Sequence, residues 1–505
     1  MPHTANRSSI CSTEELKKDK ERPTHPYMKQ LIATTVFTCL LIGQITRLAA
    51  QAASAQLTLK QCVETAINNN LAVRQAEYQS QSDKVIYQQA KANQLPYLGA
   101  SIYHGVNQGR SIDPFTNSYV TQSINFANYD INTNITLWNG SAIRNNIKQT
   151  ELSYKASQLD WQQEKDNITI NVILAYLQVL NNQEQLSIAK SQLEVSRNQV
   201  SRLEILNNNG AIAPSVLYDL RAQFSGDELS VVNAKNTLES AKVSLAQLMN
   251  VAYNTALQLE PMGTPGSVIL YDGTPDNIYM AATQQLAIVK AADTRNLSAQ
   301  KRVASAKGQL LPTISFNGGF GTNYSSLATT QQLLGTSDVS THDYVNVGGS
   351  KYNVFSPQNS YQSQKITYGD QWKNNFNSAL SIGVQVPILN GLLAKSRVKQ
   401  AEITEKRTAF EAQTVKTQLR QGVDQAYINM NSAFERFQVL SRQVEDLTNS
   451  FKAAEVRFNA GVNTTVEYLV AKNALDRANA NFVAAKYDYM LRSKVLDFYQ
   501  GKQLW

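Results

Sequence analysis

Two short segments of this chain combine glycine with hydroxyl side chains at the points where long helical patterns stop. They are Asn209–Ser215 and Asn459–Thr465. Glycine readily adopts the left-handed conformation that ends a helix, and the hydroxyl of Ser215 or Thr464 can accept a hydrogen bond from the next helix's free N–H groups. Glu467 follows the second segment, where a carboxylate complements the positive end of the returning helix. These residue types predict the tips of two helical hairpins.

Residues for enzymatic chemistry are scarce. Beyond residue 55 the sequence contains His104 and His342 as its only histidines and Cys62 as its only cysteine. A histidine-based metal site or triad, a disulfide and a thiolate cluster therefore lack material. We also find no glycine-rich phosphate-binding loop. We expect a protein that is not an enzyme and has no cofactor or metal. The net charge is +8 for the whole sequence and +5 without residues 1–55, and this mild charge argues against a nucleic-acid partner.

Apolar residues recur every seven positions after both tips, which is the pattern of a coiled-coil seam. The two series are Leu217, Phe224, Val231, Leu238 and Leu245, and Tyr468, Leu475, Phe482, Tyr489 and Leu496. Asp227 and Arg492 interrupt these faces. From Ala142 to about Asn208 there is neither proline nor glycine. One helix of roughly 100 Å is expected there, because an α-helix rises about 1.5 Å per residue.

Four segments alternate between apolar and polar residues, which predicts strands with two different faces. They are Leu98–Val106, Tyr129–Leu137, Ile314–Phe320 and Phe376–Ile388. A half-buried strand in a soluble sandwich alternates in the same way. An export signal and a length of about ten residues per strand favour the transmembrane β-barrel pattern.

The first 55 residues have the features of a signal peptide and leader. A basic segment ending in Lys29 precedes the apolar stretch Leu31–Gly43, and Ala53–Ala55 supplies the small residues that a signal peptidase needs. The apolar stretch has about a dozen residues against the ~20 that cross a bilayer, which disfavours a membrane anchor. We expect the mature chain to begin near Gln56.

The chain is internally duplicated. Leu137–Asn250 aligns without a gap with Ile388–Gly501, at an offset of 251 residues. The earlier parts also correspond, since Leu95–Pro96 matches Leu311–Pro312. Each repeat is expected to run helix, two strands, long helix, turn, helix. The predicted organisation is a leader at 1–55, a first repeat at 56–250, a linker at 251–275 and a second repeat at 276–505.

Four strands cannot close a barrel, because bacterial outer-membrane barrels have about eight strands or more and an open edge in lipid leaves backbone groups unpaired. The chain must therefore oligomerise, and three copies would supply twelve strands. The segments that join paired strands, Gly109–Ser123 and Thr322–Asn375, are expected as extracellular loops. The longer loop is expected to cover the opening or to be disordered.

Several short motifs occur in order along the duplicated frame. They are Leu57–Leu59, Asn68–Leu71, Leu95–Pro96, Leu137–Gly140, Leu311–Pro312, Val386–Gly391 and the hairpin tips after Arg202 and Arg457. Together they resemble the TolC family of outer-membrane efflux proteins, from Gln56 to the C-terminus. The loop Gly109–Pro114 resembles family members from Bacteroidetes.

This resemblance implies an α+β membrane protein with four transmembrane β-strands and long coiled-coil helices per protomer. A homotrimer would form a twelve-stranded β-barrel continued by a periplasmic α-helical barrel. The implied function is the outer-membrane exit duct of a tripartite efflux or type I secretion system, passively conducting small molecules or drugs. The implied partners are outer-membrane lipid, a periplasmic adaptor (membrane fusion protein) and an inner-membrane pump of the resistance-nodulation-division or ABC type.

The resemblance also implies roles at the tips, which in the family form the periplasmic mouth and meet the adaptor. The matching residues are Gly210, Ala211, Ile212, Ala213 and Pro214 in the first tip, and Gly461, Val462, Asn463 and Thr464 in the second. Relatives carry acidic rings just past the tip as a cation-favouring gate, and Glu467 occupies one such position. Val216 and Val470 stand where other acidic residues would be, so cation selectivity stays open.

One alternative of another class remains: a periplasmic coiled-coil adaptor or structural rod without a pore. Adaptors also contain helical hairpins, but their strands form soluble domains. They lack two strand pairs inside a duplicated helical frame.

Overall fold

The computed structural model describes residues 56–113, 117–262, 270–502 and 504. The expected leader at 1–55 lies outside the described residues. The chain divides into two compact units. In the smaller unit, Leu57 forms a parallel bridge with Leu259, and the Leu57 N–H donates to the Gln258 carbonyl oxygen at 2.9 Å. The larger unit, residues 58–255 and 261–505, contains the helices and strands that follow.

A pair of short helices precedes the first strand of each half. They are α2 (Leu59–Asn69) and α3 (Leu71–Ala92), then α6 (Pro275–Gln285) and α7 (Ala287–Gly308). Asn70 separates the first pair, and its side chain accepts a hydrogen bond from the Ala72 N–H at 2.8 Å, as an N-cap does. Among the described helices, none has both the length and the hydropathy that crossing a bilayer as a helix requires.

Each half ends in a long helical hairpin. The first consists of α4 (Ala142–Asn208) and α5 (Pro214–Met249), and the second of α9 (Leu393–Asn459) and α10 (Thr465–Tyr499). The long helix expected from Ala142 is confirmed, since α4 runs without a break to Asn208. No proline or glycine interrupts this segment. Both α4 and α9 have 67 residues, and both bounds of α9 lie 251 positions after those of α4.

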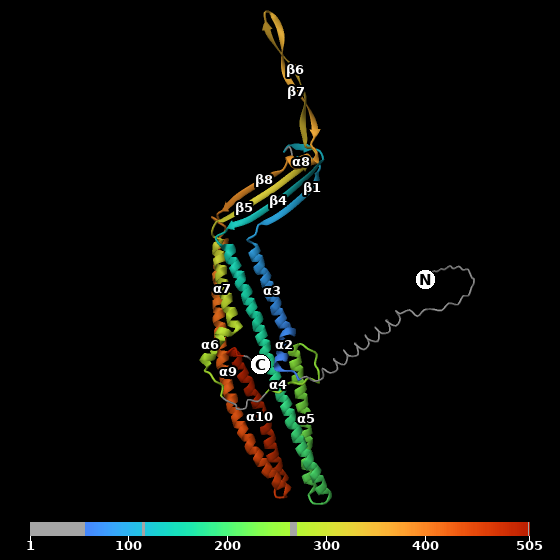
Figure 1. Ribbon diagram of the computed structural model, residues 1–505, viewed down its shortest axis with the longest axis vertical. Helices are drawn as coiled ribbons and strands as arrows, with labels where there is room; N and C mark the ends of the chain where they lie inside the picture. Colours follow the sequence, from blue (N-terminus) through green and yellow to red (C-terminus); the bar gives the residue numbers. More distant parts are fainter. Residues whose placement is uncertain (1–55, 114–116, 263–269, 503, 505) are drawn as a thin grey trace, which may run out of the picture. The chain divides into compact units, whose positions relative to one another are not determined.

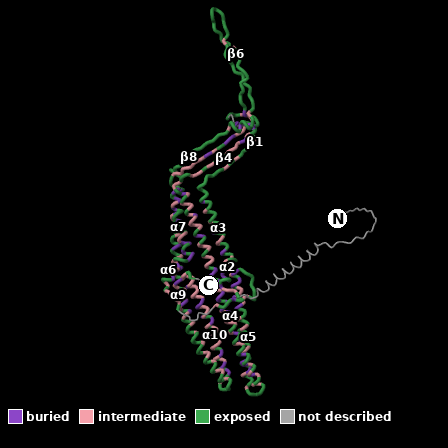
Figure 2. Tube along the Cα trace, in the orientation of Figure 1, coloured by how far each residue is buried: buried purple, intermediate pink, exposed green. Residues whose placement is uncertain are grey.

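The seven-residue seams pack as expected. Leu217, Leu238 and Leu245 are buried on α5, and Tyr468 and Leu496 are buried on α10. Figure 2 shows such buried positions interspersed along the helices, which is the pattern of seams rather than of one central core.

Four strands form one antiparallel sheet in the order β1-β4-β5-β8 (Figure 1). They are β1 (Tyr97–Asn107), β4 (Ile124–Trp138), β5 (Thr313–Ser325) and β8 (Asn377–Gln385). The four predicted strands are therefore confirmed. The last is shorter than the alternation suggested, because Pro387 lacks a backbone N–H and the strand stops at Gln385.

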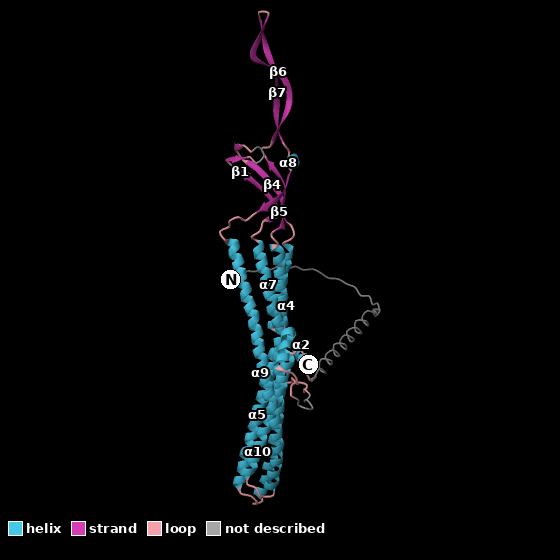
Figure 3. Ribbon diagram, turned by 90° about the vertical axis from the view of Figure 1, so that its left-hand side faces the viewer, coloured by secondary structure: helices cyan, strands magenta, loops and turns pink. Residues whose placement is uncertain are grey.

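The helices next to the sheet keep the order of the strands. α3 packs on α4, α4 on α7 and α7 on α9. Each of these helices joins a strand directly along the chain: α3 leads to β1, β4 to α4, α7 to β5 and β8 to α9. Figure 3 shows the strands passing into the helices through short loops. We call this the four-helix layer.

Glycines make the turns from strand to helix possible. Gly140 and Gly391 have φ angles of 61°, in the left-handed region, and Ser141 and Leu392 follow in the same region. At Gly140 space is also limiting, because a Cβ there would lie 2.4 Å from the carbonyl oxygen of Gly308. A Cβ at Gly391 would meet nothing within 4 Å.

The segments that join paired strands contain more structure than the sequence suggested. The shorter one includes β2 (Arg110–Ile112) and β3 (Tyr119–Thr121). The longer one, expected as a loop, contains β6 (Thr329–Val347), β7 (Ser350–Lys365) and the short helix α8 (Tyr368–Asn374). β6 and β7 form an antiparallel hairpin that turns at Gly348 and Gly349, both with positive φ, and its register shifts at Leu333/Gly335 and at Ser340/Tyr344.

Candidate functional site

The four-stranded sheet has one apolar and one polar face, fixed by its register. Ala100 pairs with Ile131, Ile131 with Phe320, and Phe316 with Ile382. Residues paired across strands share a face, so the apolar side chains collect on one side. That face carries Leu98, Ile102, Tyr129, Ile131, Ile135, Phe316, Phe320, Leu380, Ile382 and Val384.

The opposite face of the sheet is polar. Asn134 pairs with Asn317, which in turn pairs with Ser381, and the Asn134 side chain donates to Asn317 Oδ1 at 2.5 Å. The same face carries Ser101, Asp130, Asn132, Asn317, Asn377 and Ser381. Among the described residues nothing covers the β8 part of the apolar face, since Leu380 and Ile382 are 66% and 68% exposed. A sheet of this kind suits a boundary between an apolar medium and water.

The two outer strands of the sheet have one unpaired edge each, and the two outer helices of the four-helix layer have exposed apolar residues. β1 and β8 each pair on one side only, and α3 and α9 are the outer helices of the four-helix layer. Exposed apolar residues stand at seven-residue spacing on both outer helices. They are Leu71, Tyr78 and Val85 on α3, and Ile403 and Phe410 on α9. Such stripes are typical of helices that pack on a further helix.

The hairpin tips have the geometry expected from their glycines. Gly210 and Gly461 have φ angles of 69° and 74°. The following N–H groups close the helix ends, since Ala211 donates to the Leu206 carbonyl oxygen and Val462 to that of Arg457, each at 2.9 Å. Of the tip residues singled out from the sequence, Ile212 and Asn463 are half-buried and the others are exposed, namely Gly210, Ala211, Ala213, Pro214, Gly461, Val462 and Thr464.

The two returning helices begin differently. The prediction that Ser215 caps α5 was wrong: the helix begins at Pro214, and Ala213, two residues before Ser215, stands at the N-cap without a side-chain bond. Thr464 caps α10 as predicted, accepting from the Glu467 N–H at 3.3 Å, while Glu467 Oε2 accepts from the Thr464 N–H at 3.0 Å. This reciprocal capping box already gives Glu467 a local role.

The two hairpins pack against each other beside their tips. Tyr468 of α10 is buried with Leu203 and Leu217 of the first hairpin. Arg202 of α4 donates to the carbonyl oxygen of Asn459 at 2.9 Å, and so satisfies one of the free acceptors at the end of α9.

A buried ion pair links the hairpins near the tips. Lys472 of α10 donates to Asp227 Oδ2 on α5 at 2.9 Å and to Asp476 Oδ2 on its own helix at 2.7 Å. The side chains of Lys472 and Asp227 are 3% and 8% exposed. Gln223 also donates to Asp227 Oδ1 at 2.9 Å. We call Lys472, Asp227 and Asp476 the buried charge cluster.

Burial affects the protonation of groups in and beside the buried charge cluster. Burial raises the pKa of the Asp476 carboxyl, against the effect of Lys472, which favours the ionised form. Burial likewise raises the pKa of the neighbouring Tyr468 hydroxyl, whose oxygen has no hydrogen-bond partner among the described residues. Removing one charge of such a cluster leaves the others without compensation.

This cluster could be predicted only in part from the sequence. Asp227 was visible as the residue that interrupts the apolar seam of α5, but a break in a seam does not name its partner. Lys472 lies 245 residues away on α10. The other exception, Arg492, pairs within its own helix with Asp488 at 2.9 Å.

The described residues offer little for metal or thiol chemistry. They contain no group of three or more His, Cys, Asp or Glu side chains that could hold a metal ion. Cys62 is buried on α2, and burial raises the pKa of its thiol to about 11, which leaves it protonated and unreactive near neutral pH.

The sequence and fold are similar to those of known outer-membrane proteins. A family model described as outer membrane efflux protein matches residues 62–251 and 278–502. The outer membrane protein TolC of Escherichia coli is 23% identical over 340 residues, which are 66% of this chain and 60% of that protein. TolC of Vibrio cholerae is 21% identical over 399 residues, 79% of this chain and 80% of that protein.

Among solved structures, the outer-membrane channel OprN superposes with a TM-score of 0.69 at 17% identity, over 88% of this chain and 90% of that one. The CmeC outer membrane channel of Campylobacter jejuni gives a TM-score of 0.68 at 15% identity, over 88% and 85%.

Proposed function

Because the chain belongs to the outer membrane efflux protein family, we propose that it is the outer-membrane exit duct of a tripartite efflux or type I secretion system. The two-faced sheet is the observation that carries this proposal. Its apolar face, with Leu380 and Ile382 largely exposed, suits contact with lipid. Its polar face, with Asn134 and Asn317, suits a water-filled lumen.

The free edges support closure by further copies of the same chain. In lipid the unpaired backbone groups of β1 and β8 need partners, and β1 of one copy can pair with β8 of the next. The exposed stripes of α3 and α9 would then meet across the same boundary. A homotrimer gives a β-barrel of twelve strands, continued by a helical barrel. Twelve is an even number of strands within the range of bacterial barrels.

The hairpin tips are the proposed docking surface for a periplasmic adaptor. Most of their residues are exposed, they carry small side chains such as Ala211 and Ala213, and their glycines allow a compact turn. An adaptor hairpin can approach such a surface closely. The energy for transport would come from an inner-membrane pump, and transport through the duct itself would be passive.

The region of the hairpin tips is also the proposed gate. The buried charge cluster joins α5 to α10, so separation of the hairpins requires exposure of Lys472 and Asp227. Glu467 lies at the start of α10 and is exposed. In a trimer three copies of Glu467 would surround the mouth and attract cations.

The duct proposal is tested by placing one lysine on each face of β8. Leu380→Lys puts a charge on the apolar face, and Ser381→Lys puts the same charge on the polar face one residue away. A lysine facing lipid costs up to about 2–4 kcal/mol, so Leu380→Lys should lower the amount of trimer recovered from outer membranes. Ser381→Lys should assemble normally and shift the ion selectivity of bilayer conductance towards anions.

The native protein should fractionate with the outer membrane as a detergent-requiring trimer that conducts ions. Recovery as a soluble monomer would refute the proposal, and so would equal assembly of the two lysine variants.

A further inference from the structure

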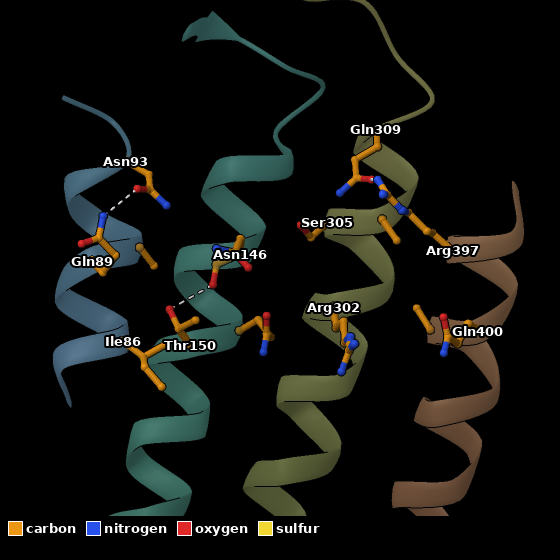
Figure 4. A pocket seen from close by; sticks show the side chains of 14 residues that line it. Ile86, Gln89, Asn93, Asn146, Thr150, Arg302, Ser305, Gln309, Arg397 and Gln400 are labelled. Atoms are coloured by element: carbon orange, nitrogen blue, oxygen red, sulfur yellow. Dashed lines mark hydrogen bonds between the residues drawn. The ribbon is translucent and has the colours of Figure 1, made fainter. Parts of the chain in front are cut away.

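A polar hollow of about 660 Å³ lies in the four-helix layer (Figure 4). Residues of α3, α4, α7 and α9 line it, near the helix ends that join the sheet. Its volume is within the range of sites that hold small molecules in proteins, roughly 300–1,000 Å³.

The hollow is positively charged. Arg302 of α7 and Arg397 of α9 line it, and among the described residues no aspartate or glutamate does. Arg397 donates to Gln309 Oε1 at 3.3 Å, which leaves most of its donors free. The side chain of Arg302 makes no hydrogen bond or ion pair with another described residue. The amides of Gln89 and Gln400 add neutral donors and acceptors to the lining.

The duplicated frame shows that the fold does not need these arginines. The hollow is lined by two copies of the same set of positions, one from α3 and α4 and one from α7 and α9. Arg302 corresponds to Ile86, and Arg397 corresponds to Asn146. All four residues line the hollow, so the same helical backbone accepts neutral side chains at both positions.

The basic residues just outside the hollow behave differently. Lys307 and Lys399 correspond to lysines in the first half, Lys91 and Lys148. Both lie beside one carboxylate, since Glu402 is 3.6 Å from Lys307 and 3.7 Å from Lys399. Among the residues that line the hollow, positive charge therefore occurs only on Arg302 and Arg397, in the second half, and neither forms an ion pair with a described residue.

We propose that this hollow binds small anions that carry two or more carboxylate or phosphate groups. A guanidinium presents paired N–H donors that match the oxygens of such groups, and two guanidiniums favour an anion with two of them. The lining amides complete the hydrogen bonds of the ligand. Binding at this hollow does not depend on the duct proposal.

The experiment is calorimetric titration of citrate into the purified full-length oligomer in detergent at low salt. Each arginine is replaced by the residue at the corresponding position of the first repeat, giving Arg302→Ile and Arg397→Asn. We expect saturable binding to the native protein and a loss of roughly tenfold to a hundredfold in affinity for each variant. The double variant should show no binding, while its helical circular dichroism and oligomeric state remain those of the native protein.

The matched control is the double variant Lys307→Gln/Lys399→Gln, which removes the same charge from the same region but leaves the hollow intact. It should keep citrate affinity within about threefold, because the ion pairs it removes are at the surface. Absence of citrate binding to the native protein would overturn the proposal. Equal weakening by the lysine and arginine double variants would overturn it as well, since attraction by the general field would then suffice.

Discussion

Replacing Lys472 with methionine should loosen the junction between the two helical hairpins. The substitution keeps the length of the side chain and removes the only cation of the buried charge cluster. Asp227 and Asp476 then remain beside each other with side chains 8% and 21% exposed. Breaking a buried pair in this way costs about 3–5 kcal/mol, so amide exchange limited by local opening should accelerate roughly 150- to 5,000-fold.

The assay is hydrogen exchange with mass spectrometry on peptides that cover the first turns of α10. Lys486→Met is the matched control, because Lys486 also links α10 to α4 by an ion pair with Glu184, but these side chains are 16% and 33% exposed. A pair of that exposure contributes less than about 1 kcal/mol, so exchange should change less than about fivefold. Asp227→Asn should give an intermediate rate, because Lys472 keeps Asp476 at 2.7 Å.

The pH dependence of this variant has a definite sign. Lys472 favours the ionised form of Asp476, while burial raises the pKa of that carboxyl. Without the lysine the pKa rises further, so the folded state favours the protonated acid more strongly. After correction for intrinsic exchange, the Lys472→Met protein should therefore exchange more slowly as the pH falls from 7 to 5. Equal exchange in the Lys472 and Lys486 variants would refute the reasoning, as would an opposite pH trend.

Five further substitutions, in three sets, test other parts of the structure. Gly391→Ala adds only the strain of a left-handed residue, about 1–2 kcal/mol, whereas Gly140→Ala also brings its Cβ to 2.4 Å from the Gly308 carbonyl oxygen. Trimer yield should therefore fall much more for Gly140→Ala. Equal yields of the two variants would contradict the close approach of Gly140 to Gly308. Gly210→Val or Gly461→Val should impair efflux in complemented cells while trimers still assemble, because a helix of 67 residues separates each tip from the sheet. Unchanged efflux in both variants would refute the adaptor role of the tips. Glu467→Gln keeps the capping box, so thermal stability should change by less than about 1 kcal/mol, while cation preference in bilayers should fall. An unchanged reversal potential would leave Glu467 with its capping role alone.

Local patterns in the sequence predicted the helices well because their causes are local. The absence of proline and glycine after Ala142 set the extent of α4, and Gly210 and Gly461 marked the turns that follow the long helices. The four strands of the sheet were also predicted, since the alternation of residues such as Leu380 and Ser381 reflects the different environments of the two faces of the sheet.

The remaining features depend on contacts between distant residues or on weaker turn signals. The β6–β7 hairpin was missed because Thr, Gln, Ser and Asn dominate its strands, although Gly348–Gly349 between two extended runs is a recognisable hairpin turn. The pairing of Lys472 with Asp227 could not be predicted, because one seam contains no information about which neighbour it meets. Ser215 was assigned a cap from residue type alone, but the start of α5 is set by Pro214.

The equal lengths of α4 and α9 restrict how the protein can change in evolution. Each has 67 residues between its junction glycine and its tip, and the two ends are joined by contacts such as that of Arg202 with Asn459. Deleting one heptad from α4 alone would shorten that helix by about 10 Å and separate these partners. Deleting the matching heptad from both helices would preserve them. Insertions and deletions in this region are therefore expected to occur as matched pairs, so that α4 and α9 change in length by the same number of residues.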